Sequence, residues 1–105
     1  MMGGQIEYIE ENIIRCLKCD ITSILKKLKS ILDQFNFVRT KSINKKYMIE
    51  FRFKDYPNLH VIITQNDRGV DINVHEDIAY HYGAFTKRCE DLLANIKEVL
   101  TQKIG

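Results

Sequence analysis

The residues whose types best suit chemistry lie in the segment 71–77, DINVHED, with a further histidine at His81. Imidazoles and carboxylates gathered near one strand end are ligands for divalent metals and are also groups that act as acid and base. His75, Asp77 and His81 are therefore candidate metal ligands, although two histidines six residues apart match no established metal motif. The alternative interpretation is a solvated strand face that runs into a helix start.

Three cysteines, Cys16, Cys19 and Cys89, offer a second possible chemistry. A C-x-x-C spacing serves redox chemistry where it follows a strand and opens a helix, and it serves zinc where a second pair completes four ligands. Here Cys16 and Cys19 fall inside a predicted helix, with no strand before them and no second pair. We expect both to be small, partly buried helix residues and Cys89 to belong to the core, with no cofactor bound.

Charge is distributed unevenly along the chain, although the net charge is only +2. Residues 15–54 hold 11 basic and 3 acidic residues, a net charge of +8, and the remainder has a net charge of −6. This asymmetry indicates an anionic partner or self-association between unlike surfaces, unless folding intermixes the two parts. The candidate nucleic-acid residues are Lys26, Lys27, Lys29, Arg39, Lys41, Lys45 and Lys46.

Apolar spacing in the segment 5–35 predicts a long N-terminal helix. Six residues spaced alternately by four and three form the stripe, namely Leu17, Ile21, Ile24, Leu28, Ile31 and Phe35. An earlier stripe, Ile6, Ile9 and Ile13, aligns with it imperfectly. Asp20 is a candidate N-cap, so the helix is either continuous or bent or split near residues 19–20.

The middle of the chain predicts a three- to four-stranded antiparallel meander. Strands are expected at 37–43, from Tyr47, at 59–65 and from Val70, with tight turns at Asn44-Lys45 and at 66–69, where Gly69 accepts a positive φ. Alternation places Tyr47, Ile49, Phe51 and Phe53 on one face, with Leu59, Val61 and Ile63 and with Val70, Ile72 and Val74 also facing inward. A closing helix follows over about 84–104, with Phe85, Cys89, Leu92, Ile96, Val99 and Leu100 as its apolar stripe.

These elements predict a single α+β domain over residues 1–105, flexible at 1–5, with both helices on one face of the sheet. Length and an apolar fraction of 45% fit one core. We expect no signal peptide, and the sequence shows no membrane-length apolar run and an odd cysteine count, so we expect a cytoplasmic protein that does not engage a membrane. It also lacks nucleophile and phosphate-loop motifs, so an enzyme is not favoured.

The other face of the predicted sheet is polar and is explained by no packing requirement. Its candidate partner-binding residues are Arg52, Lys54, His60, Asp71, Asn73 and His75. Mixed charges favour an orientation-specific contact over a phosphate track. The first hypothesis is therefore a small non-enzymatic binding or accessory domain that engages a protein partner or a second copy of itself. Nucleic-acid binding through the basic region is the alternative, and metal-dependent activity around His75 and His81 is the third.

Overall fold

The structure is a computed structural model that describes residues 5–102. Within this range the elements are, in order, β1 (Ile6–Glu10), β2 (Ile13–Leu17), α1 (Ile21–Lys27), α2 (Lys29–Leu32), β3 (Phe35–Ile43), β4 (Lys46–Phe53), β5 (Leu59–Asn66), β6 (Gly69–Ile78), β7 (His81–Ala84) and α3 (Lys87–Thr101). The chain is therefore an α+β protein dominated by antiparallel sheet. The expected flexibility of residues 1–5 concerns positions outside the described residues, apart from Gln5.

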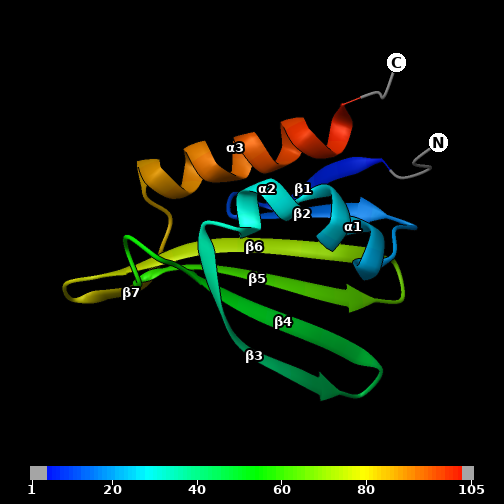
Figure 1. The fold of residues 1–105 in the computed structure, drawn as a ribbon, viewed down its shortest axis with the longest axis horizontal. Helices are drawn as coiled ribbons and strands as arrows, with labels where there is room; N and C mark the ends of the chain where they lie inside the picture. The colour runs from blue at the N-terminus through cyan, green and yellow to red at the C-terminus, as the bar shows by residue number, and fades with distance from the viewer. Residues whose placement is uncertain (1–4, 103–105) are drawn as a thin grey trace.

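One antiparallel sheet contains all of the described strands. Its order is β1-β2-β6-β5-β4-β3, and β7 pairs with β6. The consecutive strands β3 to β6 pair as hairpins, whereas the chain between β2 and β3 runs through α1 and α2 to the opposite edge. Figure 1 shows α1, α2 and α3 on the same side of the sheet. We expected a long N-terminal helix and the closing helix on this face, whereas the structure has the short helices α1 and α2 there beside α3.

The predicted long N-terminal helix is wrong, and so is the prediction of only three or four strands. Residues 6–17 form the hairpin β1–β2, and β2 pairs with β6 far along the chain. The stripe was misleading because Leu17 and Phe35 lie in strands and Leu28 lies at the break between α1 and α2, so only Ile21, Ile24 and Ile31 are helical. Lys18 adopts a left-handed φ of 60°, which no α-helix can run through. Asp20 is confirmed as an N-cap, because its side chain accepts a hydrogen bond from the Thr22 backbone N–H.

The two predicted tight turns are confirmed. Asn44 and Lys45 both have positive φ, 49° and 67°, as a two-residue hairpin turn between β3 and β4 requires. Gly69 has a φ of 147°, and the Asn66 side-chain oxygen accepts hydrogen bonds from the backbone N–H groups of Arg68 and Gly69. Asn66 pairs directly with Gly69, which fixes the register of β5 against β6.

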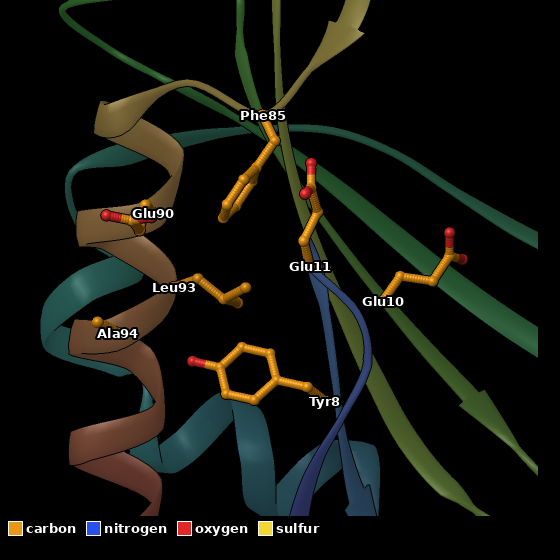
Figure 2. Close-up of a pocket in the computed structure, with 7 residues that line it drawn as sticks. All are labelled: Tyr8, Glu10, Glu11, Phe85, Glu90, Leu93 and Ala94. Carbon is orange, nitrogen blue, oxygen red and sulfur yellow. The ribbon is translucent and has the colours of Figure 1, made fainter.

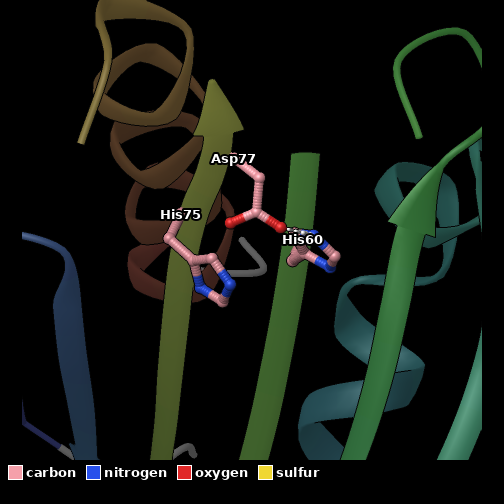
Figure 3. Close-up of side chains that lie close together, drawn as sticks. All are labelled: His60, His75 and Asp77. Carbon is pink, nitrogen blue, oxygen red and sulfur yellow. Dashed lines mark hydrogen bonds and ion pairs between the residues drawn. The ribbon is translucent and has the colours of Figure 1, made fainter. Parts of the chain in front are cut away.

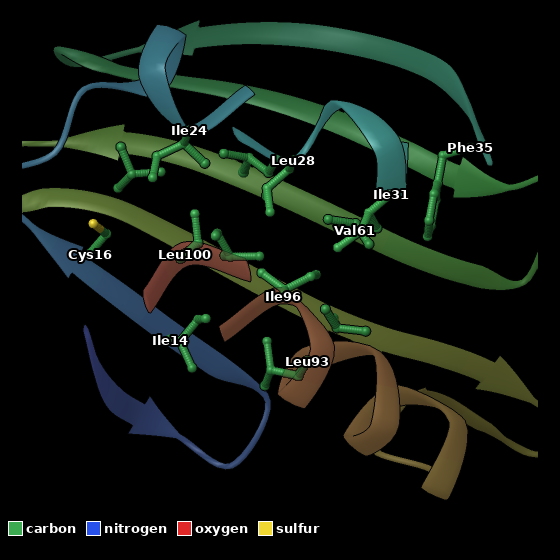
Figure 4. Packing of buried hydrophobic residues seen from close by; sticks show 14 of the residues in the cluster. Ile14, Cys16, Ile24, Leu28, Ile31, Phe35, Val61, Leu93, Ile96 and Leu100 are labelled. Carbon is green, nitrogen blue, oxygen red and sulfur yellow. The ribbon is translucent and has the colours of Figure 1, made fainter. Parts of the chain in front are cut away.

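The core lies between the sheet and the helices (Figure 4). Its sheet side comes from the predicted inward positions, because Ile49, Val61, Ile63, Ile72 and Val74 are buried. Phe51 and Leu92 are partly buried and pack against this cluster. The buried face of α3 consists of Cys89, Leu93, Ile96 and Leu100, so the predicted stripe omitted Leu93. The strand parity read from the sequence is therefore right.

The closing helix begins and ends close to the predicted bounds. Thr86 caps α3, since its hydroxyl oxygen accepts a hydrogen bond from the Cys89 backbone N–H. The Thr86 hydroxyl also donates to the carboxylate of Glu76, a buried residue of β6, at 2.7 Å, which holds the helix start against the sheet. Across residues 5–102, the helices are too short or too polar to cross a membrane.

Candidate metal-binding site

The sheet face away from the helices carries a row of polar side chains that the strand register aligns. Arg52 on β4 pairs with His60 on β5, and His60 pairs with His75 on β6. All three side chains share the parity opposite to the core residues. Figure 3 shows His60, His75 and Asp77 projecting from neighbouring strands with the helices behind the sheet. We refer to His60, His75 and Asp77 as the histidine cluster.

His60 stands between two carboxylates. Its Nδ1 is 3.2 Å from Glu50 Oε2, and its Nε2 is 3.0 Å from Asp77 Oδ2. Glu50 also forms ion pairs with the guanidinium groups of Arg39 at 3.2 Å and Arg52 at 3.9 Å. These surrounding side chains leave His60 only 6% exposed, although no described helix covers this face.

A fixed hydrogen-bond partner orients each of the other two cluster members. His75 Nδ1 lies 3.2 Å from Asn73 Oδ1, which also accepts from the Asn12 side-chain amide. Nδ1 therefore donates, and the Nε2 lone pair of His75 is available. Asp77 Oδ1 accepts from the Gly83 backbone N–H at 2.9 Å, which leaves Oδ2 facing His60.

The electrostatics keep His75 neutral and Asp77 ionised near pH 7. Burial is the largest cause that lowers the pKa of His75 below its ordinary 6.5. The hydrogen bond from Gly83 is the largest cause that lowers the pKa of Asp77 below its ordinary 3.8. A neutral imidazole and an ionised carboxylate are the forms that bind metal ions.

Two chemical arrangements fit these contacts. A neutral His60 carries only one N–H, so it can donate to Glu50 but then presents a lone pair to the Asp77 carboxylate. Either a second proton on His60 or a cation between Nε2 and Asp77 removes that conflict. One donor atom from each of His60, His75 and Asp77 lies within 4.8 Å of the others, which is the spacing of a possible metal site.

The cluster agrees only in part with the predicted metal ligands. His75 and Asp77 come together, but His81 begins β7, is exposed and lies outside the cluster. The missed ligand is His60, which we expected only to contact a partner. The hairpin turn could have revealed it, because pairing Asn66 with Gly69 and counting outward places His60 opposite His75. The other omission is Glu50, which orients His60.

The remaining residues proposed for partner binding are distributed along the same face. Asp71 forms a two-point ion pair with Arg15 on β2, at 2.6 and 2.9 Å, and also accepts from Asn66. Asn73 contacts His75. Lys54 lies beyond the end of β4 and is exposed. Binding of a protein partner through this face stays a prediction.

The basic residues proposed for nucleic-acid binding belong to two separate parts of the fold. Three of them, Lys26, Lys27 and Lys29, are on α1 and α2, whereas Arg39, Lys41, Lys45 and Lys46 belong to the β3–β4 hairpin. Arg39 is already paired with Glu50. Nucleic-acid binding also stays a prediction.

The C-x-x-C segment is not helical, contrary to expectation. Cys16 is a buried residue of β2, Cys19 lies in the turn before α1, and a disulfide joins them. The segment thus follows a strand and precedes a helix, and it sits on the core side of the sheet. Cys89 is a buried free thiol within the core, as expected.

A groove of about 390 Å³ lies on the helix side of the sheet, between the β1–β2 hairpin and α3 (Figure 2). Its lining residues are Tyr8, Glu10, Glu11, Phe85, Glu90, Leu93 and Ala94. These supply an apolar floor and carboxylates but no imidazole or thiol. The histidine cluster on the opposite face is therefore the stronger candidate for specific chemistry.

Comparison of the chain with protein-family models, with curated proteins and with solved structures finds no match.

Proposed function

We propose that this protein binds a divalent transition-metal ion of the zinc class through His60, His75 and Asp77. Two imidazole nitrogens and one carboxylate oxygen suit zinc and related first-row ions, and they leave a coordination position open. The observation that carries the proposal is the 3.0 Å distance between His60 Nε2 and Asp77 Oδ2. When His60 is neutral and donates its one N–H to Glu50, both of these atoms are hydrogen-bond acceptors. A bound cation removes the repulsion between the two acceptors, because both atoms then coordinate the ion.

The hydrogen bonds around the ligands support the same conclusion. Metal-binding histidines donate their other ring N–H to a carboxylate or carbonyl oxygen, which fixes the ring and its tautomer. Glu50 accepts from His60 in this way, and the Asn73 side-chain oxygen accepts from His75. The Gly83 N–H orients the Asp77 carboxylate. Each ligand is thus held by a partner that does not compete for the ion.

Metal binding requires a small closure of the cluster. The His60 and His75 rings are stacked, with centroids 4.8 Å apart. Tetrahedral zinc with bonds of about 2.0–2.2 Å places its ligand atoms roughly 3.4 Å apart. The donor atoms, which spread over up to 4.8 Å, must therefore approach by about 1–1.5 Å. His75 and Asp77, neither of which is fully buried, are the side chains that adjust, while their hydrogen bonds to Asn73 and Gly83 set the direction from which they approach.

The test is a calorimetric titration of untagged, chelator-treated protein with Zn²⁺. We expect one Zn²⁺ ion per chain. The affinity should fall by more than about 100-fold in Asp77→Asn or His75→Ala, because each removes a metal ligand. Loss of a residue that only orients a ligand costs roughly 10–100-fold. His81→Ala is the matched control, because His81 is an exposed histidine outside the cluster. That variant should bind as the parent does.

Binding should also stabilise the fold, because the ion binds the folded chain. At a free Zn²⁺ concentration 100 times Kd, the expected gain is about 2.7 kcal/mol. Parent protein that binds no Zn²⁺ would overturn the proposal and leave His60 as a side chain that only bridges Glu50 and Asp77. Equal losses in His81→Ala and His75→Ala would place the ion elsewhere.

A further inference from the structure

From the position of Arg52 beside the histidine cluster, we infer that the metal-loaded site takes a small phosphate-type oxyanion, bound jointly by the ion and by the Arg52 guanidinium. This inference rests on the proposed metal binding. Arg52 pairs across the strands with His60, and His60 pairs with His75, so the three side chains form one row on the open face. A ligand seated on the ion is therefore adjacent to the arginine.

Arg52 is available to such a ligand. Its side chain is 44% exposed, and its contact with Glu50 is long, at 3.9 Å. Glu50 keeps closer partners in Arg39 at 3.2 Å and His60 at 3.2 Å, so Arg52 can turn to a ligand while Glu50 still orients His60. A guanidinium presents two parallel N–H groups, which match the oxygen spacing of phosphate or carboxylate.

The metal site supplies the other half of the recognition. Three protein ligands leave a fourth position on a tetrahedral ion, and an anionic oxygen is a strong ligand there. The ion's two positive charges, one ligand carboxylate and the adjacent Arg52 together favour an anion. An oxyanion with several oxygens can reach both the ion and the guanidinium, whereas a single-atom anion reaches only one.

The charges on the rest of the face favour a small ligand over a polyanion. Beyond the cluster, the row is flanked by the Arg15–Asp71 ion pair and by the carboxylate of Glu50. A nucleic-acid backbone requires a continuous basic track. Within the described residues this face alternates in sign, which suits a compact anion that makes one oriented contact.

The experiment uses the full chain loaded with Co²⁺, whose visible absorption bands report a change of ligand. Inorganic phosphate is titrated at constant ionic strength, and acetate is titrated in parallel to separate phosphate-type from carboxylate ligands. We expect phosphate to change the bands at a lower concentration than acetate does. Arg52→Met should weaken phosphate binding by roughly tenfold or more, the usual consequence of losing a charge-assisted hydrogen bond.

Arg39→Met is the matched control. Arg39 is also exposed and also contacts Glu50, but its pairing partner across the strands is Glu50 and not a member of the cluster. Phosphate binding should change less than about threefold in this variant, and both variants should bind Co²⁺ as the parent does.

The outcomes separate the two proposals. A parent protein that binds no Co²⁺ overturns the proposed function and, with it, this inference. Co²⁺ binding without a spectral response to phosphate, or equal phosphate binding by Arg52→Met and the parent, overturns the inference and leaves the metal site standing. A lower Co²⁺ affinity in Arg52→Met would make Arg52 a positioning residue for Glu50. Tighter binding of a single-stranded oligonucleotide at equal phosphate concentration would overturn the choice of a small ligand.

Discussion

Replacing Gly69 by alanine should be among the most destabilising single-methyl additions in this chain. Gly69 begins β6 at a φ of 147°, a conformation that residues with a Cβ rarely adopt. A Cβ there would overlap the carbonyl oxygen of Cys16 and lie 2.9 Å from the backbone nitrogen of Lys18. Both obstacles are backbone atoms, which cannot rotate away as a side chain can.

The expected cost combines two terms. Holding a non-glycine residue in this backbone region costs about 1–3 kcal/mol. Relieving the overlap by shifting β2 costs about another 1–3 kcal/mol, as overpacking does in protein interiors. The sum, roughly 2–6 kcal/mol, is a large part of the ~5–15 kcal/mol that stabilises a typical domain.

Gly83→Ala is the comparison that isolates the overlap. Gly83 also has a positive φ, 73°, but a Cβ there would meet no atom within 4 Å. Its cost should be the left-handed strain alone, about 1–2 kcal/mol. Equilibrium urea unfolding measures both, as a shift of the midpoint at an unchanged slope. If Gly69→Ala does not fold, its cost lies at or above the upper end of the expected range. If the unfolding free energies of Gly69→Ala and Gly83→Ala differ by less than about 1 kcal/mol, the predicted clash is refuted.

Four further outcomes follow, two from the core and two from the titrating groups. Ile72→Ala, on the central strand and fully buried, should cost about 2–5 kcal/mol in urea unfolding, and a cost below about 1 would mean that the sheet faces are reversed. Phe51→Ala should cost less than the ~3–5 kcal/mol of a fully buried phenylalanine, because Phe51 is only partly buried. The pKa of His75 is lowered from 6.5, so the unfolded chain binds more protons there and stability should be lost as pH falls below about 6.5. His75→Gln should flatten that part of the metal-free stability curve, and an unchanged curve would contradict it. The lowered pKa of Asp77 adds stability that is present above its ordinary 3.8 and is lost at lower pH.

The sequence by itself determined the features that local chemistry controls. Alternation placed Ile49, Val61 and Ile72 on the buried face, because successive strand side chains point to opposite sides. Asn44-Lys45 and Gly69 located two turns, because few residues accept positive φ. The polar face was foreseen for the same reason, as the complement of the buried one.

Tertiary structure decided the N-terminal third of the chain and the composition of the site. Residues 6–17 have an apolar spacing that suits a helix. In the structure β2 pairs with β6, with Ile13 opposite Asn73. Local periodicity cannot predict a pairing partner that lies so far along the chain. The histidine cluster depends on register in the same way. His60 and His75 are fifteen residues apart and become neighbours only because the β5–β6 hairpin pairs them, and Asp77 reaches His60 from two residues beyond that pair. Which side chains share a face is a local property, whereas which of them touch is set by strand pairing across the sheet.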